Sequence, residues 1–160
     1  AEECVDQAAL VGDLEERASV TADLQIHGWM QVAEGSDPFK DGAVYGADWP
    51  HIEKLRKDEP ALAELIHPDL PYSCAEVVWS VRFEMARRLE DVLSRRTRAL
   101  LLNARATLES ASKVADLMAK ELDWDENRKA DEIKAFEAIA KRYILPENWK
   151  EDLDWSLKEL

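Results

Sequence analysis

The sequence predicts an all-α fold, a small multi-helix domain preceded by a long irregular connector. Glycine and proline are scarce in the 160 residues, with 5 and 6 copies, which disfavours a turn-rich β fold. Apolar residues recur at steps of three and four in several stretches, as in helices that are buried on one face. Hydrophobic residues make up 46% of the chain, enough for a core of its own.

The first 45 residues divide into a helix end and a connector. Residues 1–12 have helical composition, begin without an N-cap and close at Gly12, so we expect them to be the end of a helix that starts upstream. Residues 13–45 hold no helical period and are predicted as a connector, with one short extended piece at 20–26. Because such a long connector is unusual inside a compact domain, we expect it to lie across another surface.

Asp48 and Pro50 open the next predicted helix, as N-cap and first-turn residues. This helix ends before Pro60, and a second short helix is predicted over 60–66. The two prolines of residues 67–71 then predict a rigid turn.

Ser73 and Glu76 form a capping-box pattern at the start of a longer predicted helix. On this helix Glu84 with Arg88, and Asp91 with Arg95, would be pairs four residues apart. One apolar stripe runs along it, made of Val77, Val78, Val81, Met85, Leu89 and Val92.

Two further helices are predicted towards the C-terminus. The first covers residues 104–123, and the second follows Asp125 as N-cap and stops at Pro146. Their stripes are Leu108, Ala111, Ala115, Met118 and Leu122 in the first, and Ile133, Phe136, Ala140 and Tyr143 in the second. Residues 46–145 are thus predicted as one helical domain, and residues 146–160 as a tail with a weak helix through Trp149, Leu153 and Leu157.

The overall charge excludes several classes of protein. A net charge of −13 and a pI near 4.7 exclude a globally basic nucleic-acid binder. The apolar runs are too short to span a bilayer, and no signal-peptide pattern opens the chain. Cys4 and Cys74 are expected to be free thiols in a reducing compartment, so we expect a cytoplasmic location; the alternative is one disulfide that closes a long loop between them.

Arginine is concentrated in one segment. Residues 82–105 hold seven Arg, no Lys and three acids, so their charge is 7 − 3 = +4. Three interpretations are open: a charge network within or between domains, a solvated helix face, and a site for phosphate or RNA. Glu84 and Asp91 lie within helical reach of these arginines, which favours the network.

No catalytic constellation is evident. His27, His51 and His67 are not spaced for zinc and are expected at turns or on the surface. Cys74 near a helix start is expected to be a small buried residue. No phosphate-binding or dinucleotide-binding glycine motif is present, and Gly42–Gly46 lacks that spacing. We therefore expect no catalytic, cofactor-binding or metal-binding residue in this chain.

Four stretches carry a resemblance to a known family: Tyr45-Gly46, residues 67–71, Glu-Val-Val-Trp-Ser-Val-Arg-Phe-Glu at 76–84, and Leu-Glu-Asp-Val-Leu-Ser-Arg-Arg-Thr-Arg at 89–98. Together they resemble the C-terminal helical cap domain of FAD-dependent glycerol-3-phosphate dehydrogenases. The sequence departs from the family pattern at Trp79, where Tyr is expected, and at Asp123, where Gly is frequent.

The resemblance implies a parent enzyme that oxidises sn-glycerol 3-phosphate to dihydroxyacetone phosphate and passes electrons through FAD to quinone or oxygen. It also implies that the FAD-binding and catalytic residues lie upstream of Ala1, that residues 1–12 end the FAD-binding domain, and that this fragment is inactive alone. Its role would be to pack on the catalytic domain and stabilise it. Arg82, Glu84, Asp91, Arg95, Arg96 and Arg98 would form the structural or interdomain charge network.

The resemblance leaves some partners open. A homo-oligomer and a peripheral contact of the parent with the inner face of a membrane are compatible with it, whereas nucleic acid is not expected. The alternative function is a free-standing acidic helical adaptor or oligomerisation module, in which the six Trp would help to form a partner surface.

Overall fold

A computed structural model of the chain describes residues 2–15, 17, 18, 20–29 and 42–145. It confirms the all-α prediction: the described residues form no strand, and an isolated bridge joins Leu65 to Ser73. The α-helices are α1 (Glu2–Val11), α2 (Trp49–Asp58), α3 (Cys74–Phe83), α4 (Ala99–Leu102), α5 (Ala104–Leu122) and α6 (Glu126–Ala140). Shorter helical turns are η1 (Ala43–Asp48), η2 (Pro60–Ala63), η3 (Asp91–Arg96) and η4 (Lys141–Tyr143).

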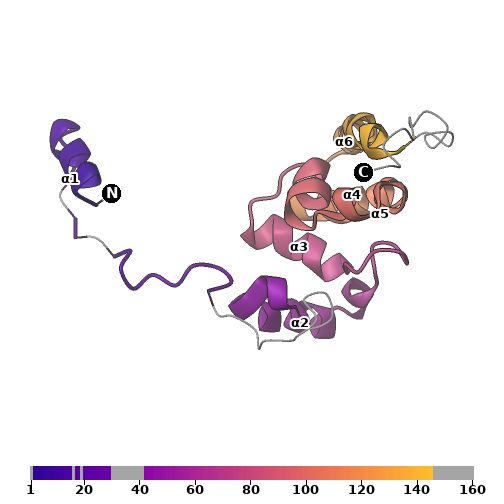
Figure 1. Ribbon diagram of the computed structural model, residues 1–160, viewed down its shortest axis with the longest axis horizontal. Coiled ribbons are helices and arrows are strands. Elements are labelled where there is room, and N and C mark those ends of the chain that lie inside the picture. The colour runs from indigo at the N-terminus through magenta and orange to yellow at the C-terminus, as the bar shows by residue number, and fades with distance from the viewer. Residues whose placement is uncertain (1, 16, 19, 30–41, 146–160) are drawn as a thin grey trace, which may run out of the picture.

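Helix α3 lies at the centre of the helical body, between α2 on one side and α5 on the other (Figure 1). All residues from Cys74 to Val81 are buried, because α3 is covered on every face. The reciprocal cap of Ser73 and Glu76 is present at its start. A helix that is buried all round needs such a cap, since water cannot satisfy its first amides.

Helices α5 and α6 follow the predicted pattern closely. Asn103 caps α5 by accepting from the amide of Ala106, and Asp125 caps α6 by accepting from the amide of Arg128. The inward stripes meet in the core, where Met118 and Phe136 are fully buried. Tyr143, the last residue of the predicted stripe, is half exposed because α6 ends at Ala140.

The single long helix predicted after Ser73 is wrong. Helix α3 ends at Phe83, and Met85 takes a left-handed conformation with φ 56° and a largely exposed side chain. The chain folds back there, because the amide of Ala86 bonds to the carbonyl of Ser80. Leu89 and Val92 still reach the core, but Leu89 lies just before the π-helical η3 and Val92 lies within it.

Two shorter expectations also need correction. The predicted helix at 60–66 is only the turn η2, after which the amide of Ile66 bonds to the carbonyl of Tyr72. Asp48 precedes α2 but does not cap it, because its carboxylate faces His27 instead. The described residues of the connector form no strand at 20–26. The predicted tail helix at 146–160 lies outside the described residues.

Candidate functional site

The arginine-rich segment 82–105 folds into the end of α3, a turn, η3 and α4. Asp91 organises the turn, since its carboxylate accepts hydrogen bonds from the amides of Arg87 and Arg88 at 2.9 and 3.0 Å. It also pairs with Arg95 at 2.7 Å. Partial burial opposes ionisation of Asp91, but the two amides and Arg95 together lower the pKa of this carboxyl below its usual value.

Most guanidinium groups of this segment bind within the helical body. Arg82 donates two hydrogen bonds, of 2.6 and 2.7 Å, to the carboxylate of Glu121 in α5. Arg87 donates to the carbonyls of Val81 and Ala86, both at 2.9 Å. These groups fasten the turn to the helical body by charge-assisted bonds, in addition to its buried apolar residues such as Leu89.

Arg88 and Arg96 also bind inside the body, but not as the sequence predicts. Arg88 pairs at 3.3 Å with Glu132 of α6, and not with Glu84, because the break in the helix separates those two. Arg96 donates to the backbone carbonyl of Glu84 at 2.6 and 3.1 Å and lies 3.7 Å from its carboxylate.

Five of the predicted residues meet around one cavity of about 520 Å³, which we name the arginine pocket. Its lining consists of Val44, Tyr45, Tyr72, Glu84, Arg95, Arg96, Thr97, Arg98 and Leu102. The chain reaches this geometry because Thr97 fixes the corner between η3 and α4, donating to the carbonyl of Val92 and accepting from the amide of Ala99. Arg82 and Asp91 lie outside the pocket lining.

A buried polar node lies behind the pocket. Glu76, almost fully buried, accepts from the Tyr45 hydroxyl at 3.2 Å and from the amide of Ser73 at 2.7 Å, and pairs with Arg56 at 3.4 Å. Burial raises the pKa of Glu76, although Ser73 and Arg56 oppose the shift. Tyr45 and Glu76, which both belong to the family pattern, therefore touch each other and join η1 to α3. Gly46 lies beside Tyr45 in η1 with a φ of 50°.

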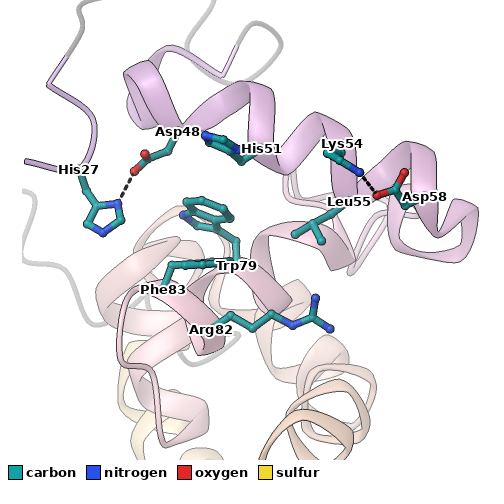
Figure 2. Close-up of a pocket in the computed structure, with 9 residues that line it drawn as sticks. All are labelled: His27, Asp48, His51, Lys54, Leu55, Asp58, Trp79, Arg82 and Phe83. Atoms are coloured by element: carbon teal, nitrogen blue, oxygen red, sulfur yellow. Dashed lines mark hydrogen bonds and ion pairs between the residues drawn. The ribbon is translucent and has the colours of Figure 1, made fainter.

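A second cavity, of about 420 Å³, lies between α2 and α3 and is walled by aromatic rings (Figure 2). The His51 ring stacks on Trp79 with 6.0 Å between centroids, and Phe83 packs against the other side of the cluster. His27 of the connector faces this cavity, with its Nδ1 2.8 Å from the Asp48 carboxylate. The Trp79 ring therefore holds α2, α3 and part of the connector together. The buried Trp79 Nε1 has no hydrogen-bond partner in the described part of the chain.

Cys74 and His67 are engaged in packing or in contacts with other side chains. Cys74 is buried, which raises the pKa of its thiol despite the nearby Lys113. His67 contacts Glu109 at 3.0 Å. Among the described residues, no three His, Cys, Asp or Glu side chains gather as a metal site. No helix within that same part of the chain is both long and apolar enough to cross a membrane.

Sequence reasoning missed Glu121 and Glu132, on which the arginine segment depends, and Arg56, which pairs with Glu76 behind the pocket. Glu132 is buried, pairs with Arg128 at 2.7 Å and accepts from the amide of Leu89 at 3.2 Å. Its spacing of four residues from Arg128 is the signal that could have found it. Arg56 also pairs with Glu53 three residues before it, a local signal, but its bond to Glu76 and the bond of Glu121 to Arg82 join distant elements.

Comparison with known proteins places this fold in a family. The model of the family described as the C-terminal domain of alpha-glycerophosphate oxidase matches residues 42–129, which include the arginine segment. Mitochondrial glycerol-3-phosphate dehydrogenase of Bos taurus is 35% identical over 96 residues, which are 58% of this chain and 13% of that protein. The probable mitochondrial glycerol-3-phosphate dehydrogenase of Dictyostelium discoideum is 33% identical over 90 residues, 56% of this chain and 14% of that protein.

The chain thus spans only a small part of the length of these curated relatives. No solved structure matches it. Because the family model covers more than half of its residues, the chain belongs to the family of the C-terminal domain of alpha-glycerophosphate oxidase and is related to glycerol-3-phosphate dehydrogenases.

Proposed function

We propose that this chain is the C-terminal helical domain of a flavoenzyme that oxidises sn-glycerol 3-phosphate to dihydroxyacetone phosphate, with electrons passed through FAD to quinone or oxygen. The observation that carries the proposal is the family match over residues 42–129. The relatives named above as glycerol-3-phosphate dehydrogenases support the same activity for the whole protein. In this proposal residues 46–145 form the domain that packs on the catalytic domain.

The glycine-containing loop at 42–46 does not fit a role in holding FAD. The glycines at 42 and 46 lack the dinucleotide-binding spacing. A Cβ atom added at Gly42 would lie 1.8 Å from the Trp49 ring, so this glycine admits the indole and not a pyrophosphate.

The domain would contribute a rigid surface that stabilises the catalytic domain. The arginine segment ties α3, α5 and α6 together through Arg82 with Glu121 and through Arg88 with Glu132. A body fastened in this way keeps its surface in one shape, which is what a domain needs in order to stabilise a neighbour. The isolated chain is expected to be inactive.

The test starts with the coding DNA upstream of Ala1. We expect an open frame that encodes a dinucleotide-binding motif, and the full protein should contain flavin and reduce a dye when glycerol 3-phosphate is added. Glycerol serves as the control substrate and should give no reduction. A stop codon and a start site directly upstream of Ala1, or a full protein without flavin, would contradict the proposal and favour the helical adaptor.

A further inference from the structure

Arg98 occupies a backbone conformation that costs the domain stability. Its φ of 57° and ψ of 19° lie in the left-handed region, where a side chain crowds the backbone and glycine is preferred. No carboxylate of the described residues lies within ion-pair distance of its exposed guanidinium. The arginine thus strains the fold without an ion pair inside the described body that would offset the strain.

The surface around Arg98 combines charged and polar groups with exposed aliphatic side chains. The pKa of the Tyr72 hydroxyl is raised by burial and by Glu76 but lowered by Arg98, so the guanidinium acts on the wall of the arginine pocket. Arg95 and Arg96 stand beside it, already oriented by their bonds to Asp91 and to the carbonyl of Glu84. Val44 and Leu102, also in the lining, are 64% and 56% exposed.

We propose that the arginine pocket is the docking surface for an acidic, aliphatic segment of the catalytic domain, with a carboxylate of that segment bound by Arg98. This inference rests on the proposed function. A planar guanidinium fork matches a carboxylate with two parallel hydrogen bonds. The exposed Val44 and Leu102 would be covered by the aliphatic part of the segment, which gains from leaving water.

The charge around the pocket favours a peptide carboxylate over a polyanion. Arg95 already binds two carboxylates and Arg96 lies near a third, so Arg98 is the cation of this pocket with no carboxylate partner in the described chain. Nucleic acid or an anionic membrane would need several such cations in a row. The chain has a net charge of −13, so most of its surface would repel a nucleic acid or an anionic membrane, and a few arginines would attract either only at short range.

The experiment uses the full protein with a photo-crosslinking amino acid, benzoylphenylalanine, at Leu102. Three versions are compared: the otherwise unchanged protein, Arg98→Gly and Asp123→Gly. Asp123 is a matched control, because it is also left-handed, at φ 53°, but ends α5 outside the pocket. Glycine suits both positions, so neither variant should unfold the domain.

We expect a crosslink to a peptide upstream of Ala1 that carries Asp or Glu within a few residues of the attachment site. Its yield should fall at least about tenfold in Arg98→Gly, the effect of losing the charge-assisted contact of the guanidinium, and stay unchanged in Asp123→Gly. A crosslink only within residues 1–160 or to a second copy of them, the absence of any crosslink, or an unchanged yield in Arg98→Gly would each overturn the inference. Oxidation of glycerol 3-phosphate is measured on the same samples. If it is present without the expected crosslink, docking fails while the proposed function stands.

Discussion

Helices α5 and α6 and the segment between Glu84 and Leu102 are neighbours in this domain, and both bury apolar side chains in its core, but they differ in how their backbone is fixed. The helix pair is joined by apolar side chains such as Met118 and Phe136, and each helix has a polar cap. The segment contains two left-handed residues, Met85 and Arg98, and a π-helical turn. It buries apolar residues such as Leu89 and Leu93, but its irregular backbone is also held by carboxylates and guanidinium groups that bind backbone atoms.

Apolar stripes and bonds from charged side chains to the backbone differ in how visible they are in a sequence. An apolar stripe repeats with the helix and therefore predicts it. Hydrogen bonds between charged side chains and the backbone can hold almost any local path, so they leave no period in the sequence.

Phe136→Ala removes apolar packing between α6 and the rest of the core. The ring is fully buried between α6 and the core, so we expect a loss of about 3–5 kcal/mol in the free energy of unfolding. Denaturant unfolding measures it. Tyr143→Ala, at a half-exposed aromatic just beyond α6, is the control and should change the free energy much less. Equal effects would mean that the α6 stripe is not the packed face.

Glu132→Ala removes the carboxylate through which α6 binds Arg88 and the amide of Leu89. The substitution leaves the amide of Leu89 without its acceptor and removes the partner of Arg88 and Arg128, so we expect a loss of about 1–3 kcal/mol. Glu137→Ala, on the same helix with a surface pair to Lys141, should cost less than about 0.5 kcal/mol. A loss for Glu132→Ala as small as that of the control would contradict the buried node.

Asp91→Ala removes the acceptor that orders the turn, and should cost about 1 kcal/mol at pH 7. The folded-state pKa of Asp91 is below the unfolded value, so its contribution is complete above the unfolded pKa, near 3.8. The contribution is lost as the pH falls through the lower folded-state pKa.

The measurement for Asp91 is denaturant unfolding of the wild type and the variant between pH 7 and pH 2. Their difference in stability should shrink below about pH 4. Asp91→Asn separates the two causes, because its amide oxygen can still accept from the backbone but carries no charge. A difference between wild type and Asp91→Ala that grows in acid would refute the assignment.

Met85→Gly separates the observed turn from a continuous helix. At an exposed left-handed residue, glycine should raise stability by about 0.4–1 kcal/mol. In a continuous helix from Ser73 to Arg95, the same change would lower stability by about 1 kcal/mol. The sign of the change in a thermal melt therefore decides between the two structures.

The sequence could predict the all-α class, the caps at Ser73 and Asp125, and helices α5 and α6, because each depends on neighbours within one or two turns. It could not predict the break at Met85, because Leu89 and Val92 keep the helical spacing although they reach the core from another turn. The arginines of the candidate site were visible as a cluster, but their partners Glu121 and Glu132 are distant in sequence. The pocket around Arg98 arises only when η1, η3 and α4 come together.

Stabilisation of a flavin-binding catalytic domain by this domain is measured by the temperature at which the full protein releases flavin. Flavin fluorescence is followed during heating of the full protein and of a version that ends at Gly12. We predict that the shortened protein releases flavin at a clearly lower temperature, because the catalytic domain has lost the surface that supports it. Release at the same temperature in both would contradict the claim.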